Sequence, residues 1–259
     1  MTGSSPPRPL AGRRVVITRL ADRADPLASE LRALGAHVVE SPLIRIEHPR
    51  RAPALDAELR ALSSYDWVVF TSVPAVEAVV RRLRALGRSV RALRSRRVAA
   101  VGPATALALR KRGIEVAVVA KTSTALGLAQ ALLRALPREA TCLLHPASDR
   151  ARGVLSERLA SAGHLVRQVA AYRTRPARGS AARALRLWER ADAVVVCSPS
   201  AVEQLAAPGR SASRGALTCI GPVTAKAARE RGFRVAAVAR SPTSRALASA
   251  LVRALRKAG

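Results

Sequence analysis

Two stretches of the chain carry nearly the same sequence, VAAVGPATALALRKRGIEVAVVA at Val98–Ala120 and LTCIGPVTAKAARERGFRVAAVA at Leu217–Ala239. Extended to residues 99–136 and 218–255, they align without a gap at a constant offset of 119 residues. Of the 38 aligned positions, 20 are identical, and only seven of these are alanines, which are abundant throughout the chain. The similarity therefore indicates an internal duplication.

Two further pairs extend the repeat. DWVVFTSVPAVEAV at Asp66–Val79 matches DAVVVCSPSAVEQL at Asp192–Leu205, and a weaker match joins Leu27–Ile46 to Leu155–Thr174. Segment A is Leu27–Ile46, segment B is Asp66–Val79 and segment C is Val98–Ala120. With their second copies A′, B′ and C′, the chain has the order A-B-C-A′-B′-C′. At 259 residues the chain is long enough for two ordinary domains, so each domain is expected to hold one complete A-B-C set.

Each segment reads as a strand followed by a helix. Short, continuously apolar runs, typical of parallel strands covered on both faces, are followed by apolar residues at helical spacing. The runs lie at residues 13–18, 67–72, 97–102, 141–146, 193–198 and 216–221. This alternation predicts doubly wound α/β domains with right-handed crossovers.

Ligands of such sheets bind beyond the carboxyl ends of the strands. Gly102 and Gly221 follow two of these strands, at the start of a helix whose unpaired N–H groups and dipole favour anions. Hydroxyl side chains gather in the same turns, at Thr71, Ser72, Thr105, Ser198, Ser200 and Thr224. Any one of them would serve equally as a helix cap, but the symmetry of the set favours a binding site.

Composition narrows the class of protein. Hydrophobic residues make up 49% of the chain without an apolar run near the ~18 residues of a membrane span, so we expect a soluble globular protein with no membrane contact. The first 14 residues, rich in Pro, Ser and Gly, lack the apolar segment of a secretion signal, which predicts a disordered leader and a cytoplasmic location. Three cysteines and four histidines are scattered, so we expect no metal and no cofactor.

The formal net charge of +28 predicts an acidic partner or ligand. Aromatic residues are only 2% of the chain and no helix-turn-helix is evident, so we expect no nucleic acid partner. Arginines spread over solvated helix faces remain the alternative explanation of the charge. No G-x-G-x-x-G, Walker A or G-x-S-x-G motif is present, which disfavours nucleotide enzymes and hydrolases.

An ordered set of eight segments closely resembles the uroporphyrinogen-III synthase family. In chain order they are VVITR, GAHVVESPLIRIEHP, YDWVVFTSVPAVEA, AVGPATALALRKRG, VRQVAAYRT, VVCSPSAVEQL, CIGPVTAKAARERG and SPTSRALASAL. The resemblance covers nearly the whole chain after the leader. It departs at Ala147-Ser148-Asp149, where the family commonly has Arg-Gly-Asp, and at Cys197, where threonine or phenylalanine is usual.

The resemblance implies two flavodoxin-like domains, doubly wound around parallel sheets and joined by a two-stranded linker. One domain would be discontinuous, residues 1–42 plus 176–259, and the other would be residues 46–171, with linker strands near 43–48 and 170–176. The duplication predicts the same division of the chain, because segment A would form one domain with B′ and C′, and segment A′ would form the other with B and C. We therefore expect the strand at 15–18 to lie in one sheet with 194–197, not with 68–71.

The implied activity is that of a hydro-lyase of porphyrin and heme biosynthesis. It cyclises the linear tetrapyrrole hydroxymethylbilane with loss of water and inverts the last pyrrole ring through a spiro intermediate. The resemblance further implies a monomer with a transient contact to the preceding enzyme of the pathway. A non-catalytic two-domain binding protein for a tetrapyrrole or another polyanion stays open, because fold does not determine function.

Site residues are carried over position by position. Tyr172 is the residue most associated with chemistry in the family, although a linker tyrosine packed on a sheet edge is the alternative. The substrate's acid arms would be bound by Thr71, Ser72, Gly102, Thr105, Ser198, Ser200, Gly221 and Thr224. Arg19 and Arg152, near strand ends, are expected carboxylate partners.

Overall fold

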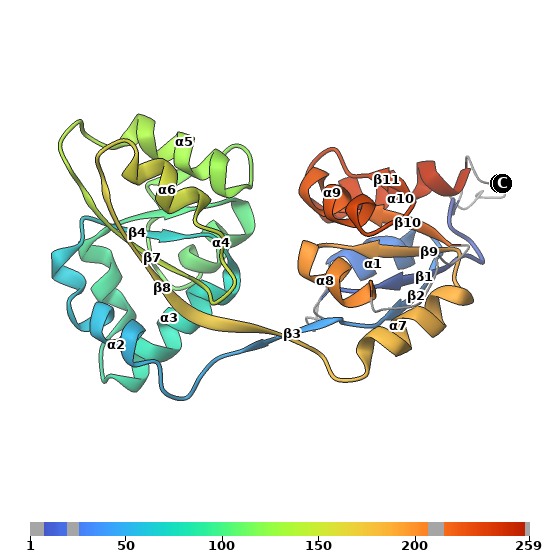
Figure 1. The fold of residues 1–259 in the computed structure, drawn as a ribbon, viewed down its shortest axis with the longest axis horizontal. Helices are drawn as coiled ribbons and strands as arrows, with labels where there is room; N and C mark the ends of the chain where they lie inside the picture. The colour runs from blue at the N-terminus through green and yellow to red at the C-terminus, as the bar shows by residue number, and fades with distance from the viewer. Residues whose placement is uncertain (1–7, 20–25, 207–214, 257–259) are drawn as a thin grey trace, which may run out of the picture. The chain divides into compact units, whose positions relative to one another are not determined.

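A computed structural model describes residues 8–19, 26–206 and 215–256 (Figure 1). The chain divides into two compact units, with the divisions between Arg45 and Ile46 and between Thr174 and Arg175. The discontinuous unit, which contains both ends of the chain, is called unit 1 here, and the inserted unit is called unit 2.

The sheet of unit 1 has the strand order β11-β10-β9-β1-β2. Its strands are β1 (Arg14–Ile17), β2 (His37–Glu40), β9 (Ala193–Val196), β10 (Ala216–Cys219) and β11 (Val235–Val238). All neighbours run parallel, and β1 pairs with β9 so that Val16 lies opposite Val194. The prediction that the first strand joins the sheet of the B′ and C′ segments is confirmed.

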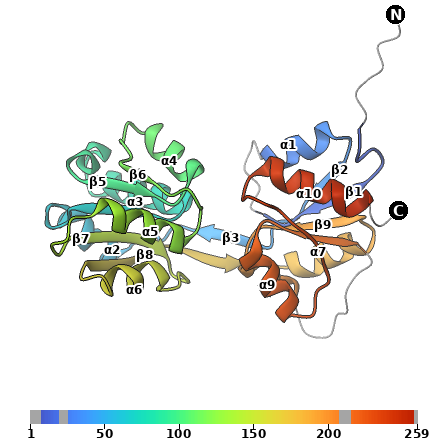
Figure 2. The same ribbon diagram turned by 90° about the horizontal axis from the view of Figure 1, so that it is seen from above.

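Helices cover both faces of this sheet (Figure 2). Helices α1 (Pro26–Ala33) and α10 (Ser244–Arg256) lie on one face, and α7 (Ser180–Glu189), α8 (Pro199–Leu205) and α9 (Pro222–Glu230) on the other. Because successive strand residues point to opposite faces, Val15 and Ile17 pack with α1 and α10, whereas Val16 packs with α7, α8 and α9. Burial on both faces explains the unbroken apolar runs.

The sheet of unit 2 has the strand order β3-β8-β7-β4-β5-β6. Its strands are β3 (Ile44–Glu47), β4 (Trp67–Phe70), β5 (Arg97–Ala100), β6 (Val118–Val119), β7 (Cys142–Ser148) and β8 (Leu165–Pro176). Without β3, the order β8-β7-β4-β5-β6 repeats β2-β1-β9-β10-β11 strand for strand. The predicted fold class, with two doubly wound parallel sheets from a duplication, is confirmed.

Two helical layers also enclose the sheet of unit 2 (Figure 1). Helices α2 (Pro53–Arg60), α3 (Val73–Ala85) and α4 (Pro103–Arg110) share one apolar cluster with the sheet, and α5 (Ala125–Ala135) and α6 (Val154–Ala160) share another. Short 3-10 helices, η1 (Leu62–Ser64) and η2 (Val90–Ser95), precede β4 and β5. After α4, Gly113 has a φ of 70°, which lets the chain leave the helix in a left-handed turn.

Strands β3 and β8 carry the chain across the two divisions between the units. Instead of a separate linker strand beginning near residue 170, β8 is one 12-residue strand that pairs with β7 from Leu165 to Tyr172 and continues to Pro176. The continuous strand places Tyr172 inside the sheet of unit 2.

The expected disordered leader is corrected in part. Residues 1–7 lie outside the described part of the chain, but Leu10 is fully buried in the cluster formed by α1, α10 and β1. Its backbone N–H donates to the carbonyl of Leu34 at 3.0 Å. An isolated leucine among prolines and arginines gives no periodic signal, so the sequence pattern did not reveal this anchor. Among the described residues, none of the helices is long and apolar enough to cross a membrane.

Candidate functional site

Two hydroxyl side chains follow β4 at its carboxyl end. Ser72 is the N-cap of α3, and its Oγ accepts from the backbone N–H of Ala75 at 3.2 Å. The same Oγ lies 3.1 Å from the phenolic Oη of Tyr172 on β8. Ser72 therefore both caps a helix and contacts the residue expected to carry chemistry, so the two interpretations of this serine do not exclude each other.

Tyr172 is a buried phenol at the carboxyl edge of unit 2, with 8% of its surface exposed. Burial, the largest influence, raises the pKa of this phenol. Its ring centre lies 6.4 Å from that of His48 with a tilt of 54°. Burial, followed by the charge of Arg81, lowers the pKa of His48 below its ordinary value. Both rings are therefore neutral near pH 7, and the phenol is held as a hydrogen-bond donor.

A loop after β7 fixes the backbone at Tyr172 and just after it. The N–H of Asp149 donates to the carbonyl of Tyr172 at 3.0 Å, and a carboxylate oxygen of Asp149 accepts from the N–H of Thr174 at 3.1 Å. The Ser148 and Thr174 hydroxyls are 3.1 Å apart. Sequence reasoning treated Ser148 and Asp149 only as a departure from the family pattern. The one available signal was that Asp149 is a carboxylate at a strand end.

His145, on β7, is a second residue that sequence reasoning passed over. Its Nε2 lies 3.1 Å from the Thr71 hydroxyl, and its side chain is only 2% exposed. Burial lowers the pKa of this imidazole to about 4. Its Nδ1 is a buried atom without a hydrogen-bond partner among the residues described. A neutral histidine thus orients Thr71 at the strand end.

Gly102 and Thr105 open helix α4. Gly102 is the N-cap in extended backbone, with a φ of 179°, so its conformation alone does not require glycine. A Cβ added there would lie 2.3 Å from Oγ and 3.0 Å from Cβ of Ser123, so a larger residue would require Ser123 to move. Thr105 is 3% exposed. The predicted role of Gly102, close approach of the backbone to a ligand, is in this structure a close approach to a serine.

The carboxyl edge of unit 1 repeats this arrangement. Ser198 is the N-cap of α8 and accepts from the N–H of Ala201 at 3.1 Å, while Ser200 lies partly exposed in the first turn. Gly221 is the N-cap of α9, and a Cβ added there would meet nothing within 4 Å. Thr224 is 3% exposed, as is Thr105 in the other copy.

The two expected arginines differ in setting. Arg19 lies two residues after the end of β1 and is partly buried, next to Thr18, whose hydroxyl donates to the carbonyl of Val195 at 2.9 Å. Arg152 is exposed in the loop between β7 and α6, next to Gly153, the N-cap of α6. Unit 2 thus joins Ser72 to Tyr172 by a hydrogen bond, and Ser198, Ser200, Gly221 and Thr224 share the carboxyl edge of unit 1. In the described part of the chain, no group of His, Cys, Asp and Glu could hold a metal ion.

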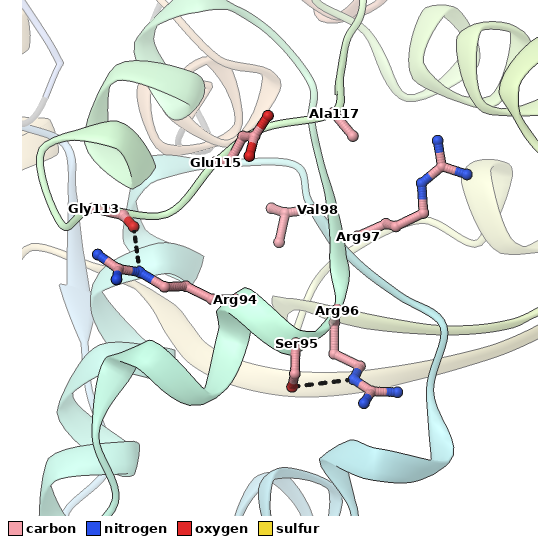
Figure 3. A pocket seen from close by; sticks show the side chains of 8 residues that line it. All are labelled: Arg94, Ser95, Arg96, Arg97, Val98, Gly113, Glu115 and Ala117. Atoms are coloured by element: carbon pink, nitrogen blue, oxygen red, sulfur yellow. Dashed lines mark hydrogen bonds between the residues drawn. The ribbon is translucent and has the colours of Figure 1, made fainter.

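A cavity of about 610 Å³ lies at the amino end of β5, the opposite edge of unit 2 from Tyr172 (Figure 3). Its arginines are engaged by the protein. Arg94 donates through Nε to the carbonyl of Gly113 at 2.8 Å, Arg96 donates to the carbonyl of Tyr65 at 2.9 Å, and the guanidinium of Arg97 stacks 4.4 Å from the ring centre of Trp67. These contacts favour a structural role for this basic cluster.

Comparisons with known proteins agree with one another. Residues 25–249 match the family model of uroporphyrinogen-III synthase HemD. The uroporphyrinogen-III synthase of Synechococcus elongatus is 32% identical over 171 residues, 65% of this chain and 63% of that protein. The chloroplastic uroporphyrinogen-III synthase of Oryza sativa is 29% identical over 242 residues, 89% of this chain and 76% of that protein.

The chain spans less than two thirds of the length of the cyanobacterial relative. Among solved structures, a mutant uroporphyrinogen III synthase from the extremely thermophilic bacterium Thermus thermophilus superposes with a TM-score of 0.67 at 22% identity, over 95% of this chain and 100% of that one. This likeness shows a shared fold.

Proposed function

We propose, since this chain belongs to the uroporphyrinogen-III synthase family, that it cyclises hydroxymethylbilane to uroporphyrinogen III. The observation that carries the proposal is the neutral phenol of Tyr172, held by Ser72 at 3.1 Å at the carboxyl edge of a parallel sheet. Ligands of doubly wound sheets bind at this edge.

The reaction begins with loss of the substrate's hydroxyl group. The departing oxygen takes the electrons of the C–O bond and leaves an azafulvene cation on the bilane. A hydrogen bond from Tyr172 Oη stabilises the charge that develops on that oxygen. Because burial raises the pKa of the phenol, Tyr172 keeps its proton at neutral pH and remains a donor throughout. The oxygen leaves as hydroxide and becomes water by taking up the proton that the last pyrrole releases when the ring finally closes.

Ring closure then depends on conformation. The cation is attacked by the substituted carbon of the last pyrrole, which forms the spiro intermediate, and fragmentation and reclosure give the inverted ring. The bilane closes without an enzyme to the I isomer, so the protein's main contribution is to hold a geometry that favours the III isomer. No strong acid or base is needed for this task.

The acid arms of the substrate are assigned to the strand-end turns of each unit. In unit 2 these are Thr71, Ser72, Gly102 and Thr105, with Arg152 nearby, and in unit 1 Ser198, Ser200, Gly221 and Thr224, with Arg19. Hydroxyl groups, helix N-termini and guanidinium groups all stabilise carboxylates. Ser72 and Ser198 would keep their capping bonds to Ala75 and Ala201 while a carboxylate approaches.

The alternative is a protein that binds a tetrapyrrole or another polyanion without converting it. A buried phenol whose backbone Asp149 holds at the carbonyl of Tyr172 and the N–H of Thr174 favours catalysis, because simple binding does not need so fixed a donor. The proposal includes action as a cytoplasmic monomer without a cofactor, with transient transfer of the unstable bilane from the preceding enzyme of the pathway.

The test is incubation of the full chain with freshly prepared hydroxymethylbilane, followed by chromatographic separation of the I and III isomers. We expect the III isomer to dominate and to increase in proportion to enzyme. A product that stays the I isomer, formed at the uncatalysed rate although the bilane is bound, would favour the binding protein.

A further inference from the structure

A cavity of about 560 Å³ in unit 1 takes no part in the site described above. It lies between the segment that follows β2 and the start of α7. Its lining contains four arginines and no acidic residue, and comprises Ser41, Pro42, Ile44, Arg45, Ala177, Arg178, Gly179, Ser180, Arg183 and Arg186. Its volume is in the range of small-molecule sites.

The walls of this cavity are held together by the chain itself. The N–H of Ala177 donates to the carbonyl of Leu43 at 3.0 Å, which ties the two segments to each other. The Ser180 hydroxyl donates to the carbonyl of Ala177 at 2.5 Å. Gly179, with a φ of 67°, turns the chain into α7 and provides no side-chain cap. The first turn of this ten-residue helix therefore faces the cavity with the positive end of its dipole.

Ser41 provides an independent indication of a ligand. The residue is 1% exposed, and its backbone N–H donates to the carbonyl of Ile17 at 2.9 Å. Its Oγ is buried and has no hydrogen-bond partner among the residues that the structure describes. Leaving a buried hydroxyl unpaired is unfavourable, and because this oxygen is covered in the unliganded chain, a ligand in the cavity pairs with it by displacing the atoms that cover it.

We propose that this cavity binds a small polyanion through carboxylate or phosphate oxygens. Arg183 and Arg186, one turn apart on α7, lie on one face of the helix, and Arg178 adds a third guanidinium from the preceding turn. Guanidinium groups bind both kinds of oxyanion with paired hydrogen bonds, and the Ser41 hydroxyl completes the set. Several cations without a lining carboxylate match a ligand with more than one negative charge.

Two sources share this chemistry. The ligand is either a pair of acid arms of the bilane or a free phosphorylated metabolite. The first assignment rests on the proposed function, whereas the preference of the cavity for oxyanions does not. Binding is therefore measured directly and without turnover, with inorganic pyrophosphate as the probe.

The experiment is calorimetric titration of the full chain with pyrophosphate. Arg183→Gln/Arg186→Gln should weaken binding at least about tenfold, because it removes two charge-assisted contacts. The control, Arg190→Gln/Arg253→Gln, removes the same charge from exposed positions of unit 1 outside the cavity and should change the affinity by less than about twofold. Failure of the wild-type chain to bind, or equal losses in both double variants, would overturn the proposal.

Ser41→Ala supplies a readout that a purely structural serine would not. Removing a buried, unpaired hydroxyl should leave the melting temperature of the unliganded chain unchanged or higher, while pyrophosphate binding weakens. A lower melting temperature with unchanged affinity contradicts the assignment of Ser41.

The source of the ligand is then distinguished by the KM for hydroxymethylbilane at saturating pyrophosphate. A raised KM assigns the cavity to acid arms of the substrate, and an unchanged KM assigns it to a separate phosphorylated ligand. Both results retain the oxyanion site. If the chain converts no bilane at all, the titrations still decide whether the site exists, so failure of the proposed function is distinguishable from failure of this inference.

Discussion

Tyr172 owes its properties to its burial and to two neighbours, Ser72 and Asp149, that are distant from it in the sequence. Ser72 accepts or donates at the Tyr172 hydroxyl, and Asp149 holds the carbonyl of Tyr172 and the N–H of Thr174. Burial keeps the phenol protonated. A donor positioned in this way needs little reorganisation when charge develops on the leaving oxygen, which is the basis of electrostatic catalysis.

Tyr172→Phe removes the donor but keeps the ring and its packing. Turnover should fall by roughly 10²-fold, as for loss of other transition-state hydrogen bonds. Product formed by the enzyme should remain the III isomer, with the I isomer rising only because uncatalysed closure competes. Turnover and isomer ratio are measured on protein whose circular dichroism matches the wild type. Wild-type turnover would return Tyr172 to simple packing on the sheet edge.

His145 makes the stability of the protein depend on pH. Its pKa is about 4 in the folded protein against 6.5 for the free side chain, so the unfolded chain binds a proton at a higher pH. Stability from this residue is present above pH 6.5 and is lost as the pH falls towards 4, by up to about 3 kcal/mol.

His145→Gln should therefore flatten the decrease of unfolding free energy between pH 7 and pH 4, measured by urea denaturation. His48, whose pKa is also lowered by burial, should retain part of the slope. His37→Gln, at an exposed position on β2, serves as the control for replacing a histidine by glutamine. An identical slope in the His145 variant would contradict the assigned cause.

Among the helices, the duplication repeats the N-termini of α4 and α9 but not the residues that pack against them. Gly102 and Gly221 occupy the same position in α4 and α9, both in extended backbone and both followed by proline. The loop that contains Ser123 packs against Gly102 only, whereas space around Gly221 is open. Equivalent residues of the two copies are therefore under different constraints.

Gly102→Ala should destabilise the protein by about 1–3 kcal/mol, because the new methyl group overlaps Ser123. Gly221→Ala shares the change of N-cap residue without the overlap and should cost only the N-cap preference, about 0.5–1 kcal/mol. The comparison is made by urea unfolding of both variants. Equal losses would show that the N-cap, rather than the contact with Ser123, determines the effect.

For the whole molecule, the formal charge of +28 attracts polyanions over distances set by salt. The Debye length, over which charges are screened, falls from ~10 Å at 0.1 M salt to ~3 Å at 1 M salt. Salt weakens the attraction between exposed arginines and a polyanion, and it weakens the contacts from buried hydroxyls and helix N-termini much less.

The KM for hydroxymethylbilane should therefore rise with salt, less steeply than duplex DNA binding does, and kcat should change little. Initial rates over a series of NaCl concentrations give both constants. A KM that is the same at low and high salt would count against recognition of the acid arms by arginine.

The fold class, the duplication and the exchange of strands between the units could be predicted from the amino-acid sequence. These follow from local patterns, namely apolar runs for strands buried on both faces and helical spacing after each run, so they are readable without contacts. Ser72 and Tyr172 were also predicted as separate site residues, because each matches a motif within a few positions.

How these residues meet could not be predicted before the chain was seen folded. The fixing of Tyr172 by Asp149 depends on the register of β7 against β8, which shifts between Ala147 and Ser148. The contact between Ser72 and Tyr172 joins residues 100 positions apart, and the difference between Gly102 and Gly221 lies in what packs against them. Sequence patterns report burial and backbone pairing, whereas such contacts depend on the packing of segments that share no local signal.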